Sequence, residues 1–323
     1  MRDENKIQER LRETARQLLR EREVGLVIGY AAGSEAYWVT PAFIKEEAQA
    51  DRLVWNPFCV NSLAKYLINY HHEPYKVAVV VKGCDSRALV RLLQDNQVQR
   101  EKVVVIGIPC LGVVDAKAAA LKIAPGTRIL GASVTDGEFL LQTESGTLSL
   151  PRGEALCAKC RYCENPTPVL ADTLLAEEVA AEPAANIYAE VREVESWPRE
   201  KRSAFWDGHF QRCLRCYACR NICPACTCRE CVFDQTDPCW VAKAHNLSEN
   251  TAFHLIRAMH VAGRCVDCGE CERACPVNIP LRLLNQKVIK DIKELFGVST
   301  PGSRLDEMPA LGMFATEDPD EFN

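Results

Sequence analysis

The hydrophobic and polar positions change their pattern several times along the chain. Within residues 1–23, the segment 5–23 places Ile7, Leu11, Ala15, Leu18 and Leu19 at helical spacing among charges. This pattern predicts an amphipathic helix that packs on its own domain or on a partner. Short β-rich runs follow at 25–30, 76–83, 102–110, 127–134 and 139–144, with helical patterns at 60–70 and 85–97 between them. Because apolar strands alternate with helices, we expect an α/β domain over residues 24–150, with a parallel or mixed sheet covered on both faces.

After residue 150 the composition and the hydrophobic pattern change again. Residues 151–204 combine a cysteine-rich start with an Ala-, Glu- and Pro-rich connector, and residues 205–297 are organised by cysteines. Helical periodicity at 254–263 and 281–297 predicts a mainly α-helical second domain. The acidic, Pro-containing segment 298–323 is expected to be disordered or to order on a partner.

Cysteine is the compositional anomaly, with 18 in 323 residues, and fifteen of them fall between Cys157 and Cys275. The N-terminal segment is charged throughout and has no apolar secretion signal, so we expect a reducing, cytoplasmic compartment and metal ligation in place of disulfides. Apolar runs of about 10 residues are too short for a membrane span. With 39 basic and 44 acidic residues and no basic stripe, nucleic acid is not expected as a partner.

Two cysteine quartets share the spacing C-x2-C-x2-C-x3-C-P. In two-cluster ferredoxins the fourth cysteine of such a motif ligates the other cluster. The expected 4Fe–4S ligand sets are therefore cluster A, with Cys213, Cys216, Cys219 and Cys275, and cluster B, with Cys265, Cys268, Cys271 and Cys223. Zinc ribbons are the alternative, although they favour two C-x2-C pairs.

Two further sets are less regular. Cluster C would use Cys226, Cys228, Cys231 and Cys239, where four thiolates also suit tetrahedral zinc. Cluster D would use Cys157, Cys160 and Cys163, which have no fourth cysteine nearby in the sequence. Four clusters need 16 thiolates, so one ligand is expected from Cys59, Cys84 or Cys110; we favour Cys110, with Cys84 as the alternative, since both follow predicted strands where α/β sheets place their ligands.

Several segments resemble known families. The run RCVDCGECERACPVNIP is similar to the second motif of helical two-cluster ferredoxins, a likeness that covers residues 205–297. The segments GLVIGY, VVVKGCDSRALVRLLQDNQVQREKVVVIGIPCLGVVD and CAKCRYC resemble the beta-subunit family of deazaflavin-reducing hydrogenases and formate dehydrogenases. This resemblance implies iron–sulfur clusters, often one FAD, and electron transfer between a catalytic subunit and a soluble carrier. Bacterial relatives accompany heterodisulfide reductase-like flavoproteins.

A flavin pyrophosphate needs backbone amides from a tight turn or a helix N-terminus. The segment KGCDSR offers Gly83 for the turn, Asp85 or Ser86 as N-cap and Arg87 as a charge partner. An ordinary strand-to-helix turn with a helix cap explains the same residues.

The sequence thus predicts an α/β domain fused to a helical two-cluster ferredoxin, in an iron–sulfur electron-transfer subunit. This subunit would connect a formate dehydrogenase or hydrogenase catalytic subunit to a heterodisulfide reductase-like flavoprotein. One alternative is an FAD-dependent oxidoreductase that reduces a deazaflavin or similar carrier. The other is a zinc-structured scaffold without redox activity.

Overall fold

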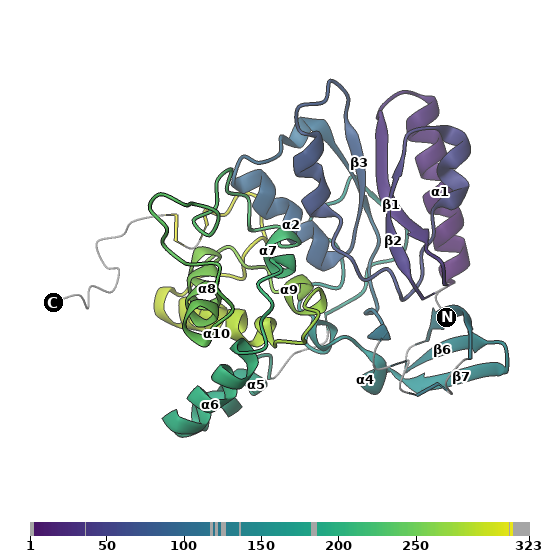
Figure 1. The fold of residues 1–323 in the computed structure, drawn as a ribbon. Helices are drawn as coiled ribbons and strands as arrows, with labels where there is room; N and C mark the ends of the chain where they lie inside the picture. Colours follow the sequence, from purple (N-terminus) through teal and green to yellow (C-terminus); the bar gives the residue numbers. More distant parts are fainter. Residues whose placement is uncertain are drawn as a thin grey trace. The chain divides into compact units, whose positions relative to one another are not determined.

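The computed structural model describes residues 3–35, 37–116, 119, 122–123, 127–135, 137–181, 186–309 and 311–312. The chain forms two compact units (Figure 1). The first contains residues 1–87 and 96–184, and the second contains residues 88–95 and 185–323. Helix α2 (Gly83–Gln94) begins in the first unit and ends in the second.

The first unit contains a five-stranded mixed sheet with the order β2-β1-β3-β4-β8. Strands β1, β3, β4 and β8 are parallel, and β2 pairs with β1 antiparallel. The strands are β1 (Leu26–Ala32), β2 (Val39–Ile44), β3 (Val77–Val81), β4 (Val103–Gly107) and β8 (Thr173–Leu174). All five residues of β3 are buried, as expected for a central parallel strand. The predicted α/β class with a mixed sheet is confirmed.

Helix α1 (Glu4–Arg20) packs on the first unit, beside β1 and β2 in Figure 1. Asp3 caps it by accepting hydrogen bonds from the first-turn amides, and Ile7, Leu11 and Ala15 are buried along one face. The Arg12 side chain donates a hydrogen bond to the Leu53 carbonyl at 2.8 Å. Of the two expected positions for this helix, the structure shows the one on its own domain.

Two expectations for the first unit were wrong in detail. Residues 127–134 and 139–144 do not extend the main sheet, because β5 (Ile129–Val134), β6 (Glu138–Thr143) and β7 (Gly146–Pro151) form a separate antiparallel sheet. The helical pattern at 60–70 forms a 3-10 helix, η2 (Ala64–Tyr70), and not an α-helix. The remaining short elements are η1 (Glu47–Arg52), η3 (Arg100–Lys102), α4 (Arg152–Ala155) and η4 (Ala158–Cys160). The first unit continues past the expected boundary at 150 and includes the described residues 151–181.

The described part of the second unit is helical apart from loops. Its helices are α5 (Ala189–Ser196), α6 (Arg199–Phe210), α7 (Ala218–Asn221), α8 (Leu247–His260), α9 (Glu270–Arg273) and α10 (Leu281–Phe296). Helix α10 ends at Gly297, whose φ of +61° is the left-handed conformation that glycine adopts at a helix C-terminus. The core of this unit includes Phe210, Phe233 and Phe253, packed against cysteines of both quartets.

Candidate metal centres

The two cysteine quartets repeat one backbone conformation. The residue two positions after the first cysteine is left-handed in both, with φ of +51° at Arg215 and +54° at Asp267. The residue before the third cysteine's helix is left-handed as well, with φ of +60° at Tyr217 and +69° at Gly269. A left-handed conformation costs free energy for L-residues. Its presence at equivalent positions of both quartets therefore indicates that the two loops have the same shape. Short helices α7 and α9 then carry the third cysteine of each quartet.

One cavity of the second unit is lined by Cys213, Cys216, Cys219 and Cys275. Three of these come from the first quartet and one from the second. The backbone amide of Arg215 donates to the Cys213 sulfur at 3.4 Å, and that of Ile279 donates to the Cys275 sulfur at 3.4 Å. Amide donors of this kind stabilise the negative charge of cluster-bound sulfur. The chemistry of this donor set therefore fits an iron–sulfur cluster.

Cys223 lies beside the second quartet. Burial, followed by the charge of the nearby Cys223, raises the pKa of the Cys265 thiol to about 12. Burial also raises the pKa of Cys271, with smaller contributions in the same direction from Cys223 and Cys265. Cys268 is buried in the same motif. High thiol pKa values mean that metal binding must displace protons from these sulfurs.

The four cysteines of the third set differ in burial and in their neighbours. Cys226 packs beside Cys223 and Cys265, whereas Cys231 packs against the aromatic core of the second unit. Cys228 and Cys239 are exposed. The assignment of these four cysteines to cluster C or zinc stays a prediction.

In the first unit, both alternative fourth ligands of the fourth set lie near it. Cys110 follows β4, and its pKa is raised to about 12 by burial and then by Cys160 and Cys163. Cys84 lies in the first turn of α2, and its pKa is raised by burial, with a smaller contribution from Cys163. Both cysteines follow parallel strands, where open α/β sheets place their ligand sites. Cys157 precedes η4, and its amide donates to the Val113 carbonyl at 3.0 Å.

In the described part of the chain, no group of three or more His, Cys, Asp or Glu side chains is arranged to hold one metal ion. Each thiolate of an iron–sulfur cluster binds a different iron, so cluster ligands surround a larger body than the ligands of a single ion do.

The residues expected to bind a flavin are committed to contacts inside the first unit. A Cβ atom on Gly83 would lie 1.6 Å from the Asn165 carbonyl oxygen, so the chain covers this turn. Asp85 accepts a hydrogen bond from the Lys82 amide at 3.1 Å, and Ser86 donates to the Gly83 carbonyl at 2.8 Å. Arg87 is buried at 6% exposure. These residues therefore do not fit a flavin pyrophosphate.

Helix α8 carries buried polar groups that the sequence reasoning missed. Its described residues include Asn250, His254 and Arg257, at 0%, 2% and 3% exposure. Burial, followed by the charges of Arg257 and Arg215, lowers the pKa of His254 to about 3. The signal was present in the sequence, because polar residues at helical spacing share a face with Phe253 and Ala258.

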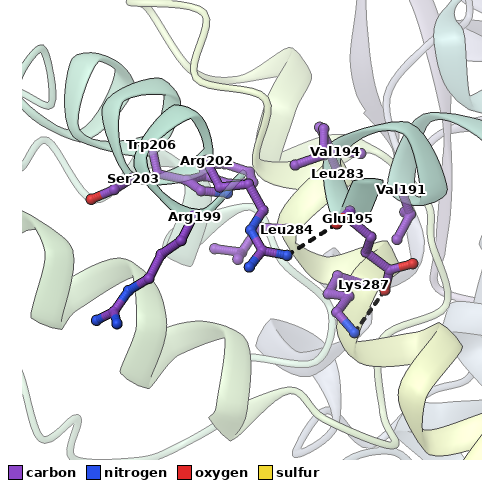
Figure 2. A pocket seen from close by; sticks show the side chains of 10 residues that line it. All are labelled: Val191, Val194, Glu195, Arg199, Arg202, Ser203, Trp206, Leu283, Leu284 and Lys287. Carbon is purple, nitrogen blue, oxygen red and sulfur yellow. Dashed lines mark hydrogen bonds and ion pairs between the residues drawn. The ribbon is translucent and has the colours of Figure 1, made fainter. Parts of the chain in front are cut away.

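A second pocket lies between α5, α6 and α10 (Figure 2). Its volume is about 320 Å³, and its walls include Val194, Trp206 and Leu284. Lys287 forms an ion pair with Glu195 at 2.8 Å on one side. None of the ten side chains drawn in Figure 2 is a cysteine, so this pocket is separate from the cluster ligands.

No helix among the described residues has the length and apolar character to cross a membrane.

Comparison with known proteins supports one family. Residues 75–186 match the family model for the C-terminal part of the coenzyme F420 hydrogenase/dehydrogenase beta subunit. The chain is 24% identical to the F420-dependent formate dehydrogenase subunit beta of Methanocaldococcus jannaschii, over 87% of this chain and 88% of that protein. It is also 24% identical to the F420-dependent formate dehydrogenase 1 subunit beta of Methanococcus maripaludis, over 89% of each.

A solved chain from the F420-reducing [NiFe] hydrogenase complex of Methanosarcina barkeri is 18% identical, with a TM-score of 0.40, and the match covers 49% of this chain and 62% of that one. The family match includes β3, β4 and the Cys157–Cys163 segment, which are among the segments that carry the resemblance noted in the sequence, whereas GLVIGY at 25–30 lies outside it. The family match and both relatives support the beta-subunit family of coenzyme F420-dependent hydrogenases and formate dehydrogenases.

Proposed function

We propose that the chain is an iron–sulfur electron-transfer subunit in which a helical two-cluster ferredoxin receives or delivers single electrons. The observation that carries this proposal is the cavity lined by Cys213, Cys216, Cys219 and Cys275. Three thiols of one quartet and the last thiol of the other line it, which supports the crossed ligation known from two-cluster ferredoxins. The repeated left-handed positions of both quartets and the position of Cys223 beside Cys265 support the same arrangement for cluster B.

The protein's part in this chemistry is to hold clusters at fixed positions and to set their potentials. A bound 4Fe–4S cluster supplies a one-electron couple, and burial, backbone donors and local charge tune it. Cluster D would be held at the ends of β3 and β4 by Cys157, Cys160 and Cys163, with Cys110 or Cys84 as the fourth ligand. Cys226, Cys228, Cys231 and Cys239 would hold cluster C or zinc.

We place this subunit between a catalytic subunit of the formate dehydrogenase or hydrogenase type and a flavin-containing, heterodisulfide reductase-like partner. The relatives with similarity over nearly the whole chain are named beta subunits of F420-dependent formate dehydrogenases, which supports the first partner. Affinity purification of the chain from its own cells, followed by mass spectrometry, tests both. Recovery of neither subunit type would contradict this placement.

The first test is the content of iron, acid-labile sulfide, zinc and flavin in one anaerobic preparation of the full chain. About 16 iron and 16 sulfide per chain without flavin correspond to four clusters. About 8 iron with zinc would limit the relay to clusters A and B. About 16 iron with one FAD would favour the carrier-reducing enzyme, and a colourless zinc protein would contradict the proposal.

Crossed ligation is tested with four single variants, namely Cys213→Ser, Cys223→Ser, Cys265→Ser and Cys275→Ser. Cys275→Ser is expected to alter the electron paramagnetic resonance (EPR) signal of cluster A, together with Cys213→Ser, while Cys223→Ser alters that of cluster B. Cys59→Ala is the matched control, because Cys59 is buried and belongs to none of the favoured sets. Should Cys275→Ser alter the same signal as Cys265→Ser, ligation is not crossed.

A further inference from the structure

Helix α8 lies between the two quartets in the sequence and directs one polar face into the protein. Asn246 caps it by accepting a hydrogen bond from the Glu249 amide at 2.9 Å. Asn250, His254 and Arg257 follow at spacings of four and three, which places them on one face of the helix. All three are at least nine-tenths buried.

The role of Asn250 is evident from its contacts. Its side-chain amide donates to the Phe210 carbonyl at 2.9 Å and to the Cys213 carbonyl at 3.2 Å. Asn250 therefore fixes the start of the first quartet against α6, and these hydrogen bonds account for it.

No hydrogen bond among the described residues explains the burial of His254. It lines the same cavity as Cys213, Cys216, Cys219 and Cys275, and neither ring nitrogen has a hydrogen-bond partner among the described residues. Its ring stacks on Phe210, with centroids 4.7 Å apart and planes at 19°. An imidazole carries an N–H donor in every protonation state, and a buried donor without an acceptor is costly.

Arg257 is a second buried group on this face that lacks a full set of partners among the described residues, and it carries a positive charge. Its Nη2 donates to the Cys219 carbonyl at 3.0 Å, while Nε has no partner among the described residues. Arg257 forms no ion pair with a carboxylate in the part of the chain that the structure describes. The groups around its guanidinium are thiols of several cysteines.

Those thiols belong to more than one expected ligand set. They are the thiols of Cys271, Cys223, Cys219 and Cys226. Cys219 is assigned to cluster A, Cys223 and Cys271 to cluster B, and Cys226 to the third set. A buried cation needs an anionic partner, and thiolate-bound clusters carry net negative charge.

We propose that α8 tunes the ferredoxin clusters, with His254 donating an N–H to a sulfur of cluster A and Arg257 placing a positive charge beside clusters A and B. This inference rests on the proposed ligand sets. Both groups stabilise the more negative, reduced cluster, so both raise its reduction potential. They are positioning residues and do not themselves carry electrons.

The experiment is an EPR-monitored redox titration of the anaerobic full chain. His254→Phe keeps an aromatic ring for stacking on Phe210 but removes the donor, and His254→Gln restores a donor. For the Phe variant we expect the reduced-to-oxidised ratio of cluster A at a fixed potential to fall about tenfold, which is about 59 mV for a one-electron couple. The Gln variant should lie closer to wild type, and cluster B should be unaffected by either change.

Arg257→Met and Arg257→Lys form the second pair. In the Met variant, the reduced-to-oxidised ratio of both clusters at a fixed potential should fall by a similar factor. The Lys variant keeps the charge, so the ratio should fall less. If the Met variant loses its clusters, the Lys variant and the two His254 variants still test whether α8 tunes the cluster potentials. Pulsed EPR of protein labelled with ¹⁵N-histidine should show coupling of cluster A to one ¹⁵N that is lost in His254→Phe.

Unchanged potentials in His254→Phe and in the cluster-retaining Arg257 variants, with no ¹⁵N coupling, would overturn the tuning role while leaving the clusters in place. Absence of iron and sulfide from the wild-type chain would instead overturn the proposed function. The two failures are therefore distinct.

Discussion

Arg282 on α10 donates a hydrogen bond from Nη2 to the Asp267 carboxylate at 2.8 Å. Asp267 is one of the left-handed residues of the second quartet, with φ of +54°, and its carboxylate also accepts from Gln286 at 3.0 Å. The Arg282 side chain is 5% exposed and that of Asp267 is 18% exposed. Helix α10 thus holds the loop that carries the first cysteines of the second quartet.

Replacing Arg282 with Met leaves Asp267 largely buried without its cation. Breaking one side of such a pair costs on the order of 2–3 kcal/mol in the free energy of unfolding, discounted here because Asp267 has some solvent contact. Urea unfolding of the anaerobic protein measures the loss. Arg304→Met is the control, because Arg304 and Asp306 are exposed at 69% and 72%. Equal effects of the two variants would contradict this role of Arg282.

The fold could be predicted from the sequence where burial is continuous. Strands such as β3 read as unbroken apolar runs because both faces are covered. The strands of the antiparallel sheet β5–β7 mix apolar and polar residues, and the pattern of a single strand does not reveal which sheet it joins. The two-residue strand β8 was not predicted, because it is too short to show any periodicity and Thr173 and Leu174 lie in a connector-like stretch.

The Lys82–Asp85 ion pair is a second testable element, in the first unit. Lys82 Nζ lies 2.8 Å from the Asp85 carboxylate, and the two side chains are 2% and 1% exposed. Nζ also donates to the Asn61 carbonyl at 2.9 Å and contacts the Tyr30 hydroxyl. Burial disfavours the charged form of Lys82, but the Asp85 carboxylate raises its pKa above the ordinary value.

Lys82→Met would leave a buried carboxylate unpaired, and we expect the free energy of unfolding to fall by on the order of 3 kcal/mol. Combining it with Asp85→Leu removes the unpaired charge, so the double variant should recover part of the loss. Urea midpoints of the single and double variants provide the measurement. A double variant as unstable as the sum of both single changes would refute this explanation.

Glu195 gives the second unit a pH-dependent contact. It pairs with Lys287 at 2.8 Å and Lys290 at 3.1 Å, and the hydrogen bond from Lys287 is the main cause that lowers the Glu195 pKa below 4.5. A carboxyl group with a lowered folded-state pKa adds stability above its unfolded pKa, and this stability disappears as pH falls through the folded value.

Glu195→Gln should therefore destabilise the protein at pH 6 by about 0.5–1 kcal/mol, a small value because Glu195 is 28% exposed. The difference from wild type should shrink as pH falls below about 4.5, where the wild-type carboxyl becomes protonated. Unfolding measured at pH 6 and near pH 4 on the metal-free chain avoids acid release of iron. A difference that grows toward low pH would contradict the sign.

The site was predictable only in part, for a physical reason. Spacing places three thiols of each quartet on one turn, but the fourth ligand and the polar groups around the ligands come from distant segments that folding brings near. His254 and Arg257 lie 35 or more positions from Cys219 in the sequence, and spacing alone does not connect them. The same limit left Cys110 and Cys84 as alternatives for cluster D.

The structure allows that choice to be tested. Cys110 is near Cys160 and Cys163, and its sulfur accepts a hydrogen bond from the Gly112 amide at 3.3 Å, a donor suited to bound thiolate. Cys84 is near Cys163 and the Asp85 carboxylate, a negative charge that opposes a thiolate there. We therefore expect Cys110→Ser to remove about four iron per chain, as loss of one 4Fe–4S cluster requires.

Cys84→Ser should retain those four iron if Cys110 is the fourth ligand. Iron and sulfide analysis of both variants, with Cys59→Ala as the common control, provides the comparison. Loss of iron from Cys84→Ser alone would transfer the ligand role to Cys84. Loss of iron from both variants, with retention of iron in Cys157→Ser, would mean that the cluster uses Cys84, Cys110, Cys160 and Cys163. Four thiolates complete the coordination of a 4Fe–4S cluster, so Cys157 would then be dispensable.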